Sequence, residues 1–414
     1  MKGRHIEIPS ADGGAFRAYL STPAAGNGPG IVLCHEIFGA NATMREAADY
    51  YAEEGYTVLV PDLFWRQAPG IELGYAGADA ERAMALYREF DENRGVDDIG
   101  AALDALRQRP ECTGDAGVLG YCLGGKLAYL AACRLPDVAA AVSYYGVGIE
   151  QALDEAAHLR GRLVLQIAGQ DRFCPPDAQQ RIAGALAGRD GVEVYVYPGV
   201  DHAFARVGDH FDQAAALMAH QRAIAAFRAA LGPHYDLSTL WEAHLTHEFD
   251  TRNVDATMAT MVAEPYVNHI PTLTGGVGHD ELKRFYTHHF VHANPPDTTI
   301  TPISRTVGAS QIVDELLFCF THTTEIDWML PGVAPTGKRV EIPLVAIVKF
   351  RGDKLYHEHI YWDQASVLVQ IGVLDPAGLP VAGVETARKL LDVTVPSNGL
   401  MRRWQDSEPS PGAQ

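Results

Sequence analysis

Short apolar runs alternate with helix-like stretches from residue 30 to residue 231, and this alternation limits the possible folds most strongly. The apolar runs are GIVLCHEIFG, YTVLVPDLF, AGVLGYCLGG, VAAAVSYYG, RLVLQIAGQD and VEVYVYPGVDH. Strands that are apolar on both faces and alternate with helices form a parallel sheet covered by helices. The sequence therefore predicts an α/β fold with a parallel-rich sheet for this region.

The pattern changes after LGPHYDLSTL, at about residues 232–240. Two helix-like stretches, LWEAHLTHEFD and HDELKRFYTHHF, precede the strand-like segments VDELLFCFTHTTEIDWML, KRVEIPLVAIVKF and KLYHEHIYWDQASVLV, the last two joined by a turn at Gly352 and Asp353. Helices followed by antiparallel strands indicate a separate α+β domain. We expect an α/β domain over 1–232, a linker over 233–240, an α+β domain over 241–395 and a flexible tail over 396–414.

Composition narrows the range of partners and locations. The 414 residues include 33 Lys and Arg against 52 Asp and Glu, a formal net charge of −19, which argues against nucleic-acid and membrane partners. The chain has no apolar stretch of about 18 residues, and its opening, MKGRHIEIPSADGG, lacks the apolar segment of a signal peptide. We therefore expect a cytoplasmic protein. The 6 Cys have no CxxC spacing and predict neither a disulfide framework nor a zinc knuckle.

The segment Gly120-Tyr121-Cys122-Leu123-Gly124 lies between an apolar strand and a helical run, as a nucleophile elbow requires. In such an elbow the glycines allow a close approach of strand and helix, and the strained turn lifts the central side chain above the sheet. The amides and dipole of a helix N-terminus favour a thiolate, which is the nucleophilic form. The alternative is a small cysteine buried in the core.

An acid and a base follow in the order that elbow chemistry needs. Asp171 comes after the strand LVLQIAGQ, and His202 comes after the strand VEVYVYPG. Later strands of an open α/β sheet deliver such residues to the edge where the nucleophile lies. Taken singly, each could be an ordinary loop residue, Asp171 as a turn or cap and His202 as a solvated side chain. Together with Cys122 they predict a catalytic triad.

Two backbone amides and one further carboxylate complete the predicted site. The N–H of Leu123, which follows the nucleophile, and that of Ile37, in the early loop HEIFG, are expected to form the oxyanion hole. Glu36 in the same loop is expected beside Cys122, where it holds or accepts the thiol proton until substrate enters. The alternative for Glu36 is a solvated loop carboxylate.

Several motifs run along residues 5–231: HEIFG (35–39), DLFWRQAPG (62–70), GYCLGG (120–125), YYGVG (144–148), GQDRFCP (169–175) and DHAFAR (201–206). This series resembles that of the dienelactone hydrolases, also called carboxymethylenebutenolidases. The resemblance implies an α/β-hydrolase fold and a Cys-Asp-His triad at Cys122, Asp171 and His202, with Glu36 as the carboxylate associated with the resting thiol.

The same resemblance implies a lactone substrate whose carboxylate is bound by two arginines and bracketed by aromatic side chains. Arg206 matches one arginine, and the positions that match aromatic pocket residues are Phe38, Tyr145 and Phe173. Ala80 and Met84 stand where the family has its other arginine and a tyrosine. Arg82 is near but lies on another helix face, and it is a further candidate for substrate binding. A less acidic or differently shaped lactone or ester is therefore possible.

Residues 241–375 resemble the SnoaL-like branch of the nuclear-transport-factor-2-like superfamily, which implies a cone of helices over a curved sheet enclosing a pocket. Period-two alternation places His357, His359 and Asp363 on one strand face, and Asp327 is placed on the neighbouring strand. We take these four side chains as candidates for the second pocket. Two His at i and i+2 can bind zinc, but spacing fixes no third ligand, so no metal is expected.

The sequence thus predicts a hydrolase of small lactones or esters that acts through a thioester on Cys122 without a cofactor, as in the degradation of aromatic compounds. One alternative is a bifunctional protein whose C-terminal pocket adds a cyclase-like or dehydratase-like step. Another is a C-terminal domain that only dimerises or binds a regulator. A homodimer through the C-terminal domain is expected, because related cone-shaped domains often pair through their sheets.

Overall fold

A computed structural model describes residues 3–407. The chain divides into two compact units, Met1–Tyr235 and Asp236–Gln414. Part of the tail predicted over 396–414 lies outside the described residues. The linker predicted over 233–240 contains the start of a helix at Leu237, because the side chain of Asp236 accepts a hydrogen bond from the Thr239 amide and caps that helix. Within residues 3–407 no helix is long and apolar enough to cross a bilayer.

The first unit is built on an eight-stranded sheet in the order β1-β2-β4-β3-β5-β6-β7-β8. The strands are β1 (Arg4–Pro9), β2 (Ala15–Ser21), β3 (Gly28–Cys34), β4 (Thr57–Pro61), β5 (Cys112–Tyr121), β6 (Val138–Tyr144), β7 (Arg162–Ala168) and β8 (Val192–Tyr197). Neighbours from β4 to β8 pair in parallel, and only β1–β2 and β2–β4 are antiparallel. The prediction of a parallel-rich α/β sheet is confirmed.

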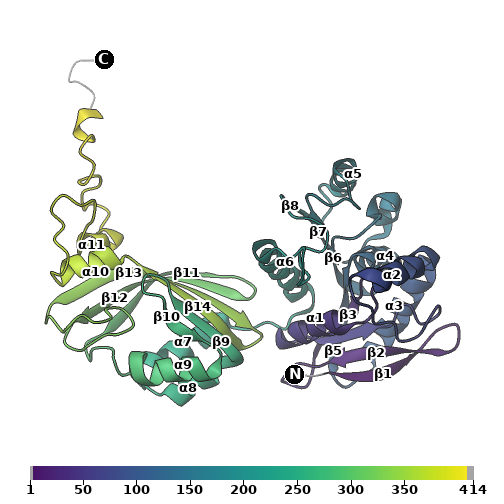
Figure 1. The fold of residues 1–414 in the computed structure, drawn as a ribbon, viewed down its shortest axis with the longest axis horizontal. Helices are drawn as coiled ribbons and strands as arrows, with labels where there is room; N and C mark the ends of the chain where they lie inside the picture. The colour runs from purple at the N-terminus through teal and green to yellow at the C-terminus, as the bar shows by residue number, and fades with distance from the viewer. Residues whose placement is uncertain (1–2, 408–414) are drawn as a thin grey trace. The chain divides into compact units, whose positions relative to one another are not determined.

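Helices lie on both sides of this sheet (Figure 1). They are α1 (Ala42–Glu53), α2 (Gly77–Glu89), α3 (Glu92–Arg107), α4 (Leu123–Arg134), α5 (Pro176–Leu186) and α6 (Gln213–Leu231). Helices α1 and α6 pack together through the rings of Tyr51, His220 and Phe227, and α3 packs against α4. Because both faces are covered, the central strands are buried along their length, and ligands of such sheets bind outside the carboxyl ends of the strands.

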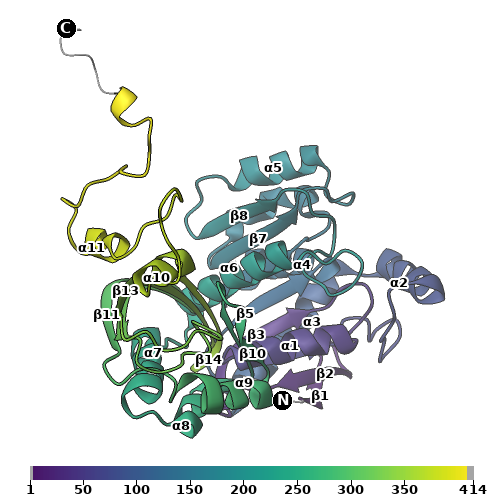
Figure 2. The ribbon, with the colours of Figure 1, turned by 60° about the vertical axis from the view of Figure 1, so that its left-hand side comes forward.

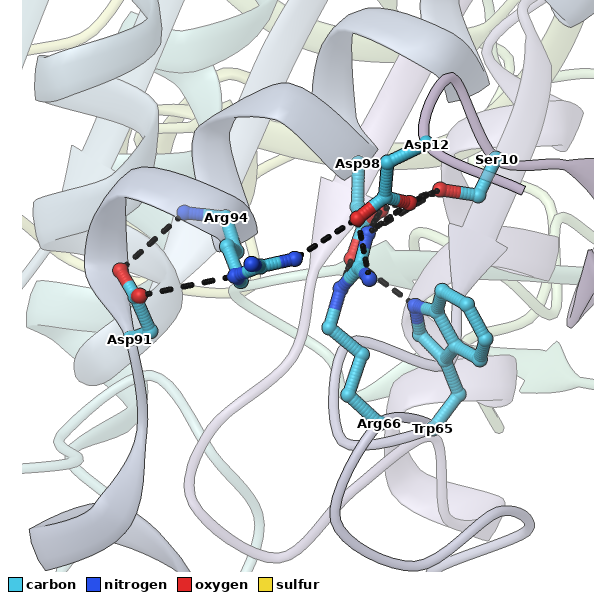
Figure 3. Close-up of polar contacts among 7 residues, drawn as sticks. All are labelled: Ser10, Asp12, Trp65, Arg66, Asp91, Arg94 and Asp98. Atoms are coloured by element: carbon cyan, nitrogen blue, oxygen red, sulfur yellow. Dashed lines mark hydrogen bonds and ion pairs between the residues drawn. The ribbon is translucent and has the colours of Figure 1, made fainter. Parts of the chain in front are cut away.

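A polar network around Asp98 on α3 anchors the loop that follows β4 (Figure 3). Asp98 is buried and accepts hydrogen bonds of 2.8 Å from Trp65 Nε1 and from Arg66 Nη2. The Arg66 guanidinium also lies 2.8 Å from Asp12, in the turn between β1 and β2. Hydrogen bonds to Asp98 and Asp12 raise the pKa of Arg66 above its ordinary value. The same loop reaches the predicted site, since the Leu63 amide donates to Nε2 of His35, the residue before Glu36.

The second unit contains a six-stranded sheet in the order β10-β9-β14-β13-β12-β11. Its strands are β9 (Met261–His269), β10 (Thr274–Val277), β11 (Thr299–Val307), β12 (Gln311–Thr321), β13 (Arg339–Arg351) and β14 (Lys354–Trp362). Its helices are α7 (Leu237–Leu245), α8 (Val254–Ala259), α9 (His279–Phe285), α10 (Gln364–Gln370) and α11 (Glu385–Leu391). Figure 2 shows the sheet curving around α7, as expected for an α+β cone.

Several details of this unit differ from the sequence prediction. Strand β12 ends at Thr321 and β14 at Trp362, whereas the predicted strands continue to 330 and 369. Asp363 stops β14 because its side chain accepts a hydrogen bond from the Ala365 amide and caps α10. Strand β14 also pairs in parallel with β9, so the sheet is not wholly antiparallel. The predicted turn at Gly352 and Asp353 is present between β13 and β14.

Candidate active site

Cys122 stands at the junction of β5 and α4 in a strained backbone conformation, with φ 57° and ψ −116°. Neighbouring glycines permit this geometry. A Cβ on Gly120 would lie 1.9 Å from the carbonyl oxygen of Gly124, and one on Gly124 would lie 2.2 Å from that of Cys34. Strand and helix therefore approach too closely for any other residue at these two positions. The junction has the geometry of a nucleophile elbow.

The imidazole of His202 connects the thiol to a buried carboxylate. His202 Nδ1 lies 2.7 Å from Asp171 Oδ2, and the side chain of Cys122 also interacts with this ring. The other oxygen of Asp171 accepts the Phe173 amide at 2.8 Å, which fixes the carboxylate. Burial lowers the pKa of His202, but the hydrogen bonds to Asp171 and Cys122 outweigh it and raise this pKa to about 10. The three predicted triad residues thus lie in one connected chain.

Glu36 pairs with Arg206. The residue is 2% exposed, and its Oε2 lies 3.1 Å from Arg206 Nε. Burial raises the pKa of Glu36, while the positive charges of Arg206 and His202 act in the opposite direction. In this arrangement the thiol of Cys122 pairs with His202 and Glu36 pairs with Arg206. The proton-holding role for Glu36 stays a prediction.

Aromatic rings surround the imidazole. The centroids of the Tyr145 and Phe173 rings each lie 4.9 Å from that of His202, both edge to face. Tyr145 is fully buried and has a positive φ of 39°, whereas Phe173 is exposed at the surface. The two predicted aromatic residues therefore bracket the histidine from a buried and an open side.

A second aromatic group, which includes a residue that the sequence analysis missed, supports Arg206. The guanidinium carbon of Arg206 lies 3.8 Å from the ring centroid of Tyr75, and this ring packs edge to face on Phe38 at 4.6 Å. A cation over an aromatic face is stabilised by the ring quadrupole. Tyr75 has no local motif that signals this contact, because it depends on chain segments far apart in sequence.

The remaining predicted residues of this site, Leu123, Ile37 and Arg82, lie on three different segments of the first unit. Leu123 begins α4, so its amide has no intrahelical carbonyl to bind. Ile37 follows Glu36 in the loop after β3 and is half-buried. Arg82 is exposed on α2. Burial raises the pKa of Tyr87, which lies on the same helix.

A cavity of about 380 Å³ lies next to this cluster. Tyr121, the residue before Cys122, lines it together with Arg206. The rest of its wall is mostly aromatic and apolar and includes Tyr50, Tyr51, Tyr144, Val207, Phe211 and Leu217. Its volume falls within the range of small-molecule pockets, about 300–1,000 Å³.

The four residues predicted for a second pocket do not line the interior of the second unit. The small cavity there is lined by Glu358 and Ile360 of β14, the face opposite His357 and His359. The rings of His357 and His359 stack on each other at 4.5 Å on the other face. Both faces of β14 carry polar side chains, so alternation alone did not identify the buried one, and the prediction was wrong.

Asp363 and Asp327 are also displaced from that interior. Asp363 caps α10. Asp327 lies beyond the end of β12, half-exposed, with its Oδ2 3.1 Å from His289 Nδ1. Their predicted place in the pocket was wrong because the strands that should have carried them end earlier in the chain.

A mostly parallel sheet with an elbow cysteine, an acid and a histidine in chain order is typical of the α/β hydrolases. Residues 16–231 match the model of the dienelactone hydrolase family, and residues 241–358 match that of the SnoaL-like domain. The first match covers more than half of the chain. The protein therefore belongs to the dienelactone hydrolase family and is a hydrolase with a SnoaL-like second domain.

Individual relatives agree with this assignment. A protein of Azospirillum brasilense, provisionally named a carboxymethylenebutenolidase, is 40% identical over 238 residues, 55% of this chain and 99% of its own. A carboxymethylenebutenolidase of Pseudomonas putida is 38% identical over 219 residues, 52% of this chain and 92% of its own. Among solved structures, a provisionally named dienelactone hydrolase from Klebsiella pneumoniae aligns with 26% identity and a TM-score of 0.49, over 55% of this chain and 99% of that chain.

Proposed function

We propose that the protein hydrolyses small lactones or esters through a thioester on Cys122, with His202 and Asp171 as the other members of the triad. The connected chain from the Cys122 thiol through His202 to the buried Asp171 carries this proposal. Cys122 also has a strained backbone conformation at the elbow, and this supports its role because strain of this kind is concentrated at functional sites.

The reaction follows from this arrangement. The Cys122 thiolate, paired with the His202 imidazolium that holds its proton, attacks the carbonyl carbon and forms a C–S bond, while the amides of Leu123 and Ile37 stabilise the negative oxygen. The ring C–O bond then breaks, and the leaving oxygen takes the proton from the His202 imidazolium. Neutral His202 next removes a proton from water, whose hydroxide attacks the thioester and releases the thiolate and a carboxylic acid.

For substrate selection we propose that Arg206 binds an anionic group of the substrate. Its Nε faces Glu36, while its guanidinium plane rests on Tyr75, so the terminal amino groups remain as donors. Phe38, Tyr145 and Phe173 supply apolar walls, and the 380 Å³ cavity supplies room for the part of the substrate that does not react. Arg82 is exposed, which leaves it at most a peripheral role.

Loss of ultraviolet absorbance from a dienelactone tests this proposal directly. We expect turnover by the wild type and by Cys133→Ala, a control that removes another buried thiol, and no turnover by Cys122→Ala. Turnover by folded Cys122→Ala would refute the thiol mechanism. If the wild type does not use a dienelactone, uncharged lactones and esters in the same three proteins test the broader proposal.

For the second unit we propose a homodimerisation role, which rests on its match to the SnoaL-like domain. Sedimentation equilibrium of the full chain should then give twice the chain mass. A monomer at all concentrations would contradict the proposal. A cyclase-like or dehydratase-like step remains the alternative for this unit.

A further inference from the structure

The second unit encloses an imidazole and two carboxylates that the proposed hydrolase reaction does not use. His244 Nε2 on α7 lies 3.0 Å from Glu248 Oε1 and 3.1 Å from Glu358 Oε1 on β14. All three residues are buried, with exposed fractions of 0%, 2% and 4%. Within residues 3–407 this is the one group of three such side chains whose potential ligand atoms all lie within 4.8 Å of one another.

Local sequence explains how these side chains meet. Glu248 follows His244 by one helical turn, so both leave the same face of the continuous α7 and π-helical segment. Glu358 lies on the buried face of β14 between other inward-facing residues. Helix α7 packs against β14, which brings the two positions together.

A second hydrogen bond fixes the protonation of the ring. Thr260 Oγ1 lies 2.6 Å from His244 Nδ1 and donates its own hydrogen to the Thr257 carbonyl oxygen at 2.6 Å. A hydroxyl has one hydrogen, so Oγ1 must accept from Nδ1, and Nδ1 carries a hydrogen. Nε2 is then the ring atom that faces both carboxylates. Such an outer hydrogen bond orients histidines that bind metals.

Charge balance favours a cation between these atoms. A neutral ring would direct its Nε2 lone pair at two negative oxygens. With both carboxylates ionised, a protonated ring would still leave one negative charge uncompensated, and a buried charge of this kind is costly unless a carboxyl binds a proton. The Tyr286 hydroxyl, 3.4 Å from Glu358 Oε1, is neutral and does not alter this count. A divalent cation held by a neutral ring and two carboxylates makes the group electrically neutral.

The spacing is also close to that of a metal site. Ligands at about 2.1 Å from a tetrahedral metal ion are separated by about 3.4 Å. The observed separations of 3.0 and 3.1 Å require only a small outward movement of the side chains. Glu248 and Glu358 also line a cavity of about 40 Å³, which is room for one water molecule as a further ligand.

We propose that His244, Glu248 and Glu358 form a binding site for a divalent first-row transition metal ion such as Zn²⁺. One nitrogen and two carboxylate ligands suit these ions better than Ca²⁺ or Mg²⁺, which prefer oxygen alone. Three protein ligands and one open position are typical of zinc sites that bind water. This site departs from the expectation, based on His357 and His359, that the chain binds no metal.

Titration of the full-length, untagged protein with Co²⁺ after chelator treatment tests the site without any activity assay. The background variant is Cys122→Ser, which removes the thiol of the first unit as a competing metal ligand. We expect one equivalent of Co²⁺ with visible absorption bands that Zn²⁺ displaces. Glu358→Gln should weaken binding at least about 100-fold, and Thr260→Val, which keeps all three ligands, by about 10–100-fold. The control His359→Ala, on the other face of β14, should bind normally.

The variants distinguish a metal site from a purely structural ion pair. Circular dichroism verifies that each protein is folded, and Thr260→Val provides the test if Glu358→Gln does not fold. The proposal is overturned if the folded background protein does not bind one equivalent of Co²⁺ at a Co²⁺ concentration of about 100 μM. It is also overturned if folded Glu358→Gln or Thr260→Val binds Co²⁺ as tightly as His359→Ala.

Discussion

His202 Nδ1 lies 2.7 Å from Asp171 Oδ2, and this ion pair makes the stability of the protein depend on pH. The pKa of His202 is raised from 6.5 to about 10, so between these pH values the folded protein binds a proton that the unfolded chain lacks. The stabilisation is therefore fully present below about pH 6.5 and is lost as the pH rises toward about 10. Urea unfolding should show that the free energy of unfolding falls more between about pH 6 and about pH 9 for the wild type than for His202→Gln. Equal losses would contradict this assignment.

Arg206 should select substrates by charge. Replacing it with Gln removes a charge-assisted hydrogen bond worth about 1.5–3 kcal/mol, so KM for a carboxylate-bearing lactone should rise about 10–100-fold. KM for a neutral ester of similar size should change little. Steady-state kinetics on the two substrates measure the difference. A similar rise for both would indicate that Arg206 acts only through its pair with Glu36.

Gly124 should tolerate no side chain. The Cβ of Gly124→Ala would lie 2.2 Å from the Cys34 carbonyl oxygen, and we expect a loss of about 3 kcal/mol or more in the free energy of unfolding. Gly184→Ala in α5 is the matched control, since nothing lies within 4 Å of its Cβ. That change should stabilise the protein by about 0.5–1 kcal/mol. Equal stability of the two variants would show that strand and helix are not closely packed at the elbow.

Asp98 should contribute more to stability than Asp12, although both bind Arg66. Asp98 is buried, and removing one partner of a buried ion pair costs about 3 kcal/mol. Asp98→Ala should therefore lower the free energy of unfolding by about that amount. Asp12 is exposed, and Asp12→Ala should have little effect. Chemical denaturation of both variants tests this order, and a larger effect of Asp12→Ala would contradict it.

The sequence alone predicted most of the first unit. Its buried strands, the elbow around Cys122 and the order of Asp171 and His202 follow from local patterns and from the rule that parallel strands end at one edge. The partner of Glu36 was not predictable in this way. Its pairing with Arg206 above Tyr75 depends on packing among three loops, which no local pattern encodes.

The second unit was less predictable for two physical reasons. Strand β14 has polar residues on both faces. The alternation of its side chains therefore did not show whether the face with Glu358 or the face with His357 is buried. The i, i+4 spacing of His244 and Glu248 was visible in the sequence, but the third member, Glu358, comes from a distant strand. A histidine and a glutamate one turn apart on the opening helix were the available signal.

Capture of the intermediate tests the central claim, that Cys122 is the nucleophile. A lactone keeps its leaving oxygen in the same molecule when the ring opens, so acylation adds the whole mass of the substrate to the protein. Rapid acid quenching during turnover, followed by peptide mass spectrometry, should find this added mass on the peptide that contains Cys122. An adduct on another residue, or turnover with no adduct on Cys122 at any quench time, would contradict the mechanism.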